Sequence, residues 1–193
     1  MRCPIIGVVG GSKVTAPNVS RAYKMAQKLG ELIARSGAIL LCGGGSGVME
    51  ASALGAKGAG GHTVGIMPSQ HPPNAGIEHA VFTAMGDGRN FLNAFVSDVM
   101  IAMKGEAGTL SEIALAIKVG TPVVYLCAWD FLNENGLPKM SYVTSPEAAI
   151  TEAFRHLGIV PRQKIDRPVK QPSVPDQEKN LTELVRMIAR WSR

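Results

Sequence analysis

The sequence predicts an α/β domain: a doubly wound, mainly parallel sheet with helices on both faces. Short apolar segments recur along the chain, and segments with apolar residues at helical spacing stand between them. Several apolar segments end in glycine, as strands do where the chain turns into a helix. Strands that alternate with helices need crossover connections, which produce a parallel sheet covered on both sides. We therefore expect a Rossmann-like architecture over residues 1–157.

The first four elements follow from this pattern. Residues 4–10 are short and apolar and are expected to form a buried strand that ends in a Gly-Gly-Ser turn. Residues 18–35 are expected to form a helix, because apolar residues recur at helical spacing: Ala22, Met25, Ala26, Leu29, Leu32 and Ile33. The apolar residues 38–42 are the second expected strand, and the Ala-rich residues 48–59 are the second expected helix.

The remaining elements are separated by proline and glycine. Residues 62–67 are expected to form a strand that stops at Pro68, and the proline-containing residues 69–76 to form a loop. The other strands and helices are expected in alternation: a strand over 80–84, a helix over 89–96, a strand over 98–103, a helix over 109–119, a strand over 121–127 and a helix over 146–157.

The amino-acid composition limits the classes of molecule that this protein is expected to bind. Hydrophobic residues make up 46% of the chain, which is enough for a sizeable core, and aromatic residues only 5%, which disfavours stacking platforms for single-stranded nucleic acid. The net charge is +5, but eight Lys or Arg and four Asp or Glu lie from Gly158 onward, so most of the excess belongs to the tail. Nucleic acid is therefore not the expected partner.

Residues 158–193 are expected to form an appendage. Residues 160–175 contain four prolines and mixed charge, which is typical of a linker. An amphipathic helix is expected beyond it, with an apolar stripe of Leu181, Leu184, Val185, Ile188 and Trp191. This helix either folds back on the domain or packs on a neighbouring subunit.

The chain has the features of a cytoplasmic protein without a metal. It begins as a strand rather than as a signal peptide, and no apolar run approaches the ~18 residues of a membrane span. The three cysteines form no disulfide framework, and Cys42 and Cys127 are expected to be buried free thiols. The histidines show no metal-ligand spacing, so no metal site is expected: His62, His71, His79 and His156.

Glycine-rich turns at the ends of the expected strands predict an anion-binding site. Glycine lets backbone N–H groups approach an anion, and a following helix N-terminus adds partial positive charge. The expected ligand-binding residues are Gly11, Ser12, Gly43, Gly44, Gly45, Ser46, Gly105, Gly108 and Thr109. The sequence lacks both the full dinucleotide fingerprint and the P-loop motif, which favours a monophosphate or a similarly compact anion.

Two charged residues could act on such a ligand. Arg89 follows a Gly-Asp-Gly turn, where its guanidinium could bind phosphate or simply lie in solvent. Glu112 fits two hypotheses. In one, the segment Thr109-Leu-Ser-Glu112 is a capping box and Glu112 only satisfies a backbone N–H. In the other, its carboxylate faces the ligand.

The order of motifs resembles a known superfamily. These motifs are Gly-Gly-Gly-Ser-Gly-Val-Met from Gly43, Val-Gly-Ile-Met-Pro from Val64, Gly88-Arg89-Asn90, and Gly-x-x-Gly-Thr-Leu-Ser-Glu from Gly105. They are similar to those of the LONELY GUY-type superfamily, also labelled "possible lysine decarboxylases", over residues 4–157. The segment Gly-Arg-Asn is most similar to its molybdenum cofactor carrier-like branch.

The resemblance implies two functions. The carrier-like branch holds a phosphorylated pterin, the molybdenum cofactor, without turning it over. The enzymes of the superfamily are nucleoside 5′-monophosphate phosphoribohydrolases; by resemblance Arg89 and Glu112 would be catalytic, and Gly105, Gly108 and Thr109 would cradle the phosphate. Here Lys104, Glu106 and Asn90 replace a proline, a glycine and a lysine of the enzyme signature.

The carrier is therefore the first hypothesis and the hydrolase the alternative. No cofactor is required; the bound molecule would be a nucleotide monophosphate, a pterin cofactor or phosphate. Both functions imply a homo-oligomer, a dimer or tetramer, because superfamily members pair through helices beside the site. The helix expected over 109–119 could supply that face, or its apolar residues could pack on the sheet: Leu110, Ile113, Ala114 and Ile117.

Overall fold

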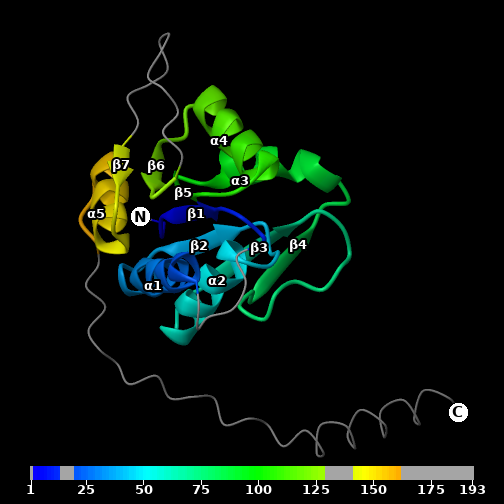
Figure 1. Ribbon diagram of the computed structural model, residues 1–193, viewed down its shortest axis with the longest axis horizontal. Coiled ribbons are helices and arrows are strands. Elements are labelled where there is room, and N and C mark those ends of the chain that lie inside the picture. The colour runs from blue at the N-terminus through cyan, green and yellow to red at the C-terminus, as the bar shows by residue number, and fades with distance from the viewer. Residues whose placement is uncertain (1, 14–19, 129–140, 162–193) are drawn as a thin grey trace, which may run out of the picture.

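Seven parallel strands form one sheet in this protein (Figure 1). The computed structural model describes residues 2–13, 20–128 and 141–161. The strands are β1 (Ile5–Val9), β2 (Ile39–Cys42), β3 (Thr63–Met67), β4 (His79–Phe82), β5 (Val99–Met103), β6 (Val123–Leu126) and β7 (Ser141–Val143). Their order is β4-β3-β2-β1-β5-β6-β7, and all six neighbouring pairs are parallel. The predicted Rossmann-like, doubly wound sheet is confirmed.

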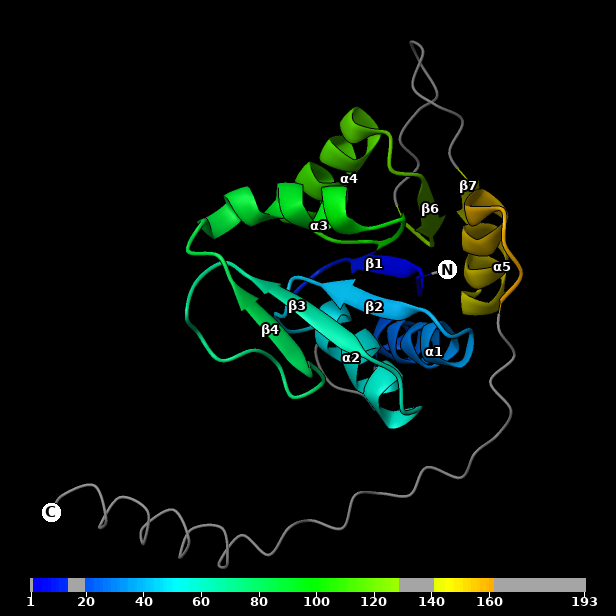
Figure 2. The same cartoon turned by 180° about the vertical axis from the view of Figure 1, so that it is seen from behind.

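Helices cover both faces of this sheet, as Figures 1 and 2 show. They are α1 (Arg21–Arg35), α2 (Val48–Gly58), the 3-10 helix η1 (Gly86–Arg89), α3 (Asn90–Val96), α4 (Ala107–Val119) and α5 (Pro146–Leu157). The helices α1, α2 and α5 pack on one face, and α3 and α4 pack on the other.

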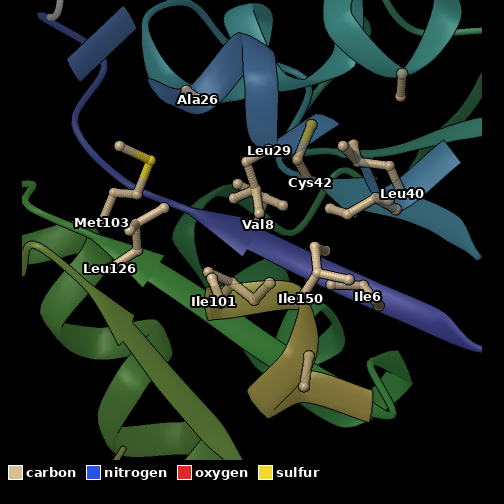
Figure 3. Packing of buried hydrophobic residues seen from close by; sticks show 14 of the residues in the cluster. Ile6, Val8, Ala26, Leu29, Leu40, Cys42, Ile101, Met103, Leu126 and Ile150 are labelled. Carbon is tan, nitrogen blue, oxygen red and sulfur yellow. The ribbon is translucent and has the colours of Figure 1, made fainter. Parts of the chain in front are cut away.

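The core has one hydrophobic cluster on each face. The larger cluster joins the apolar stripe of α1 to β1, β2 and β5 and includes Leu29, Leu40 and Ile101, all fully buried (Figure 3). The smaller cluster packs Ala94, Ile113 and Ala116 against the other face of β5 and β6. The near-continuous apolar sequence of β5 follows from this arrangement, because a central parallel strand is buried on both sides.

Some elements differ from the sequence-based expectation. The short strand β7 was not predicted, because it has only three residues and none of them is buried. Cys42 is buried as expected, but the prediction for Cys127 was wrong: it lies just beyond the end of β6, exposed, with a positive φ of 49°. The expected linker after residue 161 and the expected tail helix lie outside the described residues.

The last core helix, α5, has the ends that its sequence predicts. The Ser145 hydroxyl accepts a hydrogen bond from Ala148 N at 3.2 Å, and Pro146 occupies the first turn. Gly158 ends the helix in the left-handed conformation, with φ 64°. Within the described residues, no helix is long and apolar enough to cross a membrane.

Candidate functional site

The strand order reverses between β1 and β5, and the loops that leave these two strands are joined. β1 leads on to β2 on one side, whereas β5 lies on its other side. Gly11 N donates a hydrogen bond to Lys104 O at 3.1 Å, and Lys13 Nζ lies 2.7 Å from Glu106 Oε1. Ligands of open parallel sheets bind beyond the carboxyl ends of the strands at such a reversal.

The loop after β2 is hydrogen-bonded to the loop after β1. Ser46 Oγ donates to Ser12 O at 3.0 Å, and Val48 N donates to Gly11 O at 3.1 Å. Gly47 has a positive φ of 69°, and a Cβ there would lie 2.3 Å from Gly11 O, so only glycine allows this approach. The structure therefore brings three of the predicted glycine-rich turns together.

Gly44 and Gly45, also predicted as ligand-binding residues, are held by a residue that the sequence did not indicate. Asn74 N donates to Gly44 O at 3.0 Å, and Asn74 Nδ2 donates to Gly45 O at 2.7 Å. These bonds fix the carbonyl groups of the loop. Asn74 comes from the expected proline-containing loop over 69–76, and only its three-dimensional placement relates it to the glycines.

Arg89 lies against the loop after β2 and is not a solvated surface residue. Its side chain is only 13% exposed. A Cβ on Gly43 would lie 2.3 Å from Arg89 Nη1 and 2.5 Å from Nη2, so the guanidinium rests directly on the Gly43 backbone. Gly43 is thus required for the position of the arginine rather than for a turn.

Glu112 lies one helical turn inside α4 and holds Arg89. Its Oε1 accepts hydrogen bonds from Arg89 Nη1 at 3.1 Å and from Asn93 Nδ2 at 2.6 Å, and the residue is 7% exposed. The capping-box hypothesis is wrong, because α4 begins at Ala107 and its N-cap is Glu106. Burial raises the pKa of Glu112, while the bonds from Asn93 and Arg89 act in the opposite direction.

Asn93 is a site residue that sequence reasoning missed. It is fully buried and lies four residues after Arg89, so both side chains lie on one side of the segment that contains α3. A polar residue at this spacing within an apolar helix was the available signal. Asn90, next to Arg89, donates from Nδ2 to Ser111 Oγ at 2.7 Å and so ties α3 to α4.

The N-terminus of α4 lies beside these loops. The Glu106 side chain makes no capping hydrogen bond to the helix and pairs with Lys13 instead. Gly108 is exposed in the first turn, and a Cβ there would meet no atom within 4 Å among the described residues. Thr109 is buried below it, beside Gly105. The first turn of α4 is therefore open to a ligand, with the Lys13–Glu106 ion pair beside it.

The thiol of Cys42 lies next to the loop after β2, and its burial favours the protonated form. Cys42 ends β2 and is completely buried, and burial raises the pKa of its thiol to about 12. Gly44 N lies 3.4 Å from its Sγ. The features of the site that suit an anionic ligand are thus the N-terminus of α4 and the guanidinium of Arg89.

Residues 3–150 match the family described as SLOG cluster4. The chain is 41% identical, over 127 residues, to an uncharacterized protein of Archaeoglobus fulgidus, a match that covers 65% of this chain and 82% of that one.

Two solved structures extend the comparison. The molybdenum cofactor binding protein of Rippkaea orientalis is 39% identical (TM-score 0.71), and the match covers 82% of this chain and 99% of that chain. The molybdenum cofactor carrier protein of Chlamydomonas reinhardtii is 36% identical (TM-score 0.71), with 81% and 99% covered. The expected resemblance to the carrier-like branch of the LONELY GUY-type superfamily is confirmed, and the chain belongs to the SLOG cluster4 family.

Proposed function

We propose that this protein binds and carries a phosphorylated pterin-type small molecule, similar to the molybdenum cofactor, at the carboxyl edge of its sheet. The observation that carries the proposal is the position of Arg89, whose guanidinium is fixed between Gly43 and Glu112 of α4. A fixed guanidinium next to a helix end suits a phosphate group. Two similar proteins of known structure are described as molybdenum cofactor binding or carrier proteins, which supports the same ligand class.

The environment of Glu112 favours a carrier over a phosphoribohydrolase. A hydrolase needs a carboxylate that can reach the ribose or a water molecule. Here Oε1 of Glu112 already accepts two hydrogen bonds, and the residue is almost completely buried. We assign Glu112 the role of positioning Arg89, and Arg89 the contact with phosphate.

A matched pair of ligands tests the proposal. The full chain is titrated by calorimetry with a phosphorylated pterin and with the same pterin without phosphate. Preference for the phosphorylated form by about tenfold or more is expected, since a charge-assisted hydrogen bond contributes about 1.5–3 kcal/mol. Equal affinities would show that the anion site is misplaced, and absence of binding by either compound would remove the pterin assignment.

Gly108→Ala tests where the ligand lies. The free protein has room for the added methyl group, so its melting temperature should be unchanged or slightly higher. Ligand affinity should fall about tenfold or more if the phosphate contacts the first turn of α4, because the methyl group would stand between them. Gly58→Ala is the control: it also meets no described atom within 4 Å, but it lies at the end of α2. Equal affinity in both variants would place the ligand elsewhere.

We further propose that the protein is a homo-oligomer that pairs through the surface of β4, η1, α3 and α4. Large apolar side chains are exposed on β4, α3 and α4 and in the Thr83–Met85 loop: Val81, Phe82, Met85, Phe91, Phe95, Val96 and Leu110. Phe91 and Phe95 stack on α3 with ring centroids 5.7 Å apart. Burial of such a patch against a second copy removes apolar surface from water. On α4, Ile113 packs in the core, whereas Leu110 is 44% exposed and can join this surface.

Phe95→Glu tests the oligomer. The residue is 65% exposed, so the charge leaves the monomer fold intact but cannot be buried in an apolar interface. Light scattering during size-exclusion chromatography should give a dimer or tetramer for the wild type and a monomer for the variant. Val160→Glu, at an exposed apolar residue outside this surface, should leave the mass unchanged. A monomeric wild type would contradict the proposal.

A further inference from the structure

A second group of chemically active side chains lies at the opposite edge of the sheet from the anion site. His62 immediately precedes β3, Glu78 immediately precedes β4, and His79 is the first residue of β4. His62 Nδ1 lies 3.1 Å from Glu78 Oε2, and His79 Nε2 lies 3.5 Å from the same oxygen. One ligand atom from each of the three side chains lies within 4.8 Å of the other two.

The backbone beneath this cluster is fixed by a buried residue. Thr63 is fully buried, and its hydroxyl donates to Gly76 O at 2.7 Å and accepts from Glu78 N at 2.8 Å. The parallel register pairs Val64 with His79, which sets the two strand starts side by side. The three side chains are therefore brought together by the sheet itself, although they are exposed to solvent.

We propose that His62, Glu78 and His79 bind a divalent transition-metal ion of the Zn²⁺ class. Two imidazoles and one carboxylate are a recurrent protein ligand set for zinc, with water in the fourth position. Metal–ligand bonds of about 2.0–2.1 Å in a tetrahedron place the ligand atoms roughly 3.4 Å apart. The two distances to Glu78 Oε2 already have this size. One ring nitrogen of each histidine lies within 4.8 Å of the other's, and both rings are exposed, so they have room to rotate around an ion.

The proposed ion would connect the edge strand to the rest of the sheet. β4 is the outermost strand and pairs only with β3 among the described strands. A metal bound by His62 before β3 and by His79 on β4 would hold the start of β4 in register. It lies at the amino ends of the strands, away from Arg89 and Glu112, so its binding does not depend on the proposed carrier function.

The full chain, stripped of metal with a chelator, provides the test. Calorimetric titration with Zn²⁺ should show one equivalent bound and a higher melting temperature, because a ligand that binds the native state stabilises it. His62→Gln, Glu78→Gln and His79→Gln should each weaken this binding tenfold or more. His71→Gln, at an exposed histidine outside the cluster, should leave the affinity unchanged.

Cysteine is the competing ligand, since Cys3 and Cys127 are exposed. The double variant Cys3→Ser/Cys127→Ser should retain the equivalent of Zn²⁺, and Co²⁺ in its place should show tetrahedral absorption bands without thiolate charge transfer. Loss of binding in the cysteine variant, unchanged binding in the three cluster variants, or no binding by the wild type would each overturn the assignment.

Discussion

Replacing Arg89 by alanine is expected to weaken binding of the phosphorylated ligand by about ten- to a hundredfold, because a charge-assisted contact with phosphate is lost. The guanidinium is held by Glu112 and rests on Gly43, so its position at the site is fixed before a ligand binds. Arg155→Ala is the control: this arginine pairs with Glu152 on the exposed side of α5. Calorimetric titration of the wild type, Arg89→Ala and Arg155→Ala with the phosphorylated ligand measures the three affinities.

Gly43→Ala should reproduce the loss of affinity with the arginine still present. The new methyl group would lie 2.3–2.6 Å from three atoms of the guanidinium, which must then move. Arg89→Ala removes the positive charge, whereas Gly43→Ala only displaces it. Comparison of the two affinities therefore shows whether the position of the guanidinium matters as much as its presence. Unchanged affinity in both would mean that the phosphate does not bind at Arg89.

Glu112→Ala is expected to lower the free energy of unfolding by about 3–5 kcal/mol, because removal of one member of a buried ion pair leaves the other without compensation. Arg89 Nη1 and Asn93 Nδ2 would both lose their acceptor in a place that water scarcely reaches. Glu31→Ala is the control, since Glu31 pairs with Lys28 and Arg35 on the surface, where such pairs contribute at most about 1 kcal/mol. Urea denaturation measures both; equal losses would contradict the account.

The carboxyl group of Glu112 should also make the stability of the protein depend on pH. Its pKa in the folded state is raised above the ordinary value of 4.5, so the folded protein holds the proton more tightly than the unfolded chain does. Its contribution to stability is therefore complete below pH 4.5 and is lost as the pH rises through the raised pKa. The difference in free energy of unfolding between the wild type and Glu112→Gln should therefore fall as the pH rises above 4.5.

Glu152 is a control for this pH dependence, because its pKa is shifted in the opposite direction. Arg155 and Ser141 lower the pKa of its carboxyl group to about 2. Its contribution is present above pH 4.5 and is lost as the pH falls toward 2. The stability of the wild type relative to Glu152→Gln should therefore rise with pH, and the same trend in both comparisons would argue against a raised pKa for Glu112.

Local sequence patterns predicted most of the fold and part of the site. The alternation of apolar and amphipathic segments was sufficient for six strands and five helices, because each pattern extends over four or more residues. The glycine-rich turns were predictable for a related reason: in a parallel sheet, turns that follow strands meet at one edge. Arg89 was found from its neighbouring glycines.

Contacts between elements that are far apart in the sequence could not be predicted from it. Thr109-x-x-Glu112 has the spacing of a capping box, but the helix begins two residues earlier and Glu112 turns toward α3. The spacing of Asn93 from Arg89 was a signal in the sequence, but its bond to Glu112 became visible only with α3 and α4 packed together. His62 and His79 are 17 residues apart and meet through the register of β3 with β4, which no sequence spacing reveals.

The most direct test of the central claim is the fate of the ligand. The protein is incubated with a phosphorylated pterin and with a panel of nucleoside 5′-monophosphates, including cytokinin forms, and the recovered compounds are separated by chromatography. A carrier should return every compound intact, while the phosphorylated pterin raises the melting temperature. Release of a free base that stops in Glu112→Gln would contradict the carrier and identify a phosphoribohydrolase.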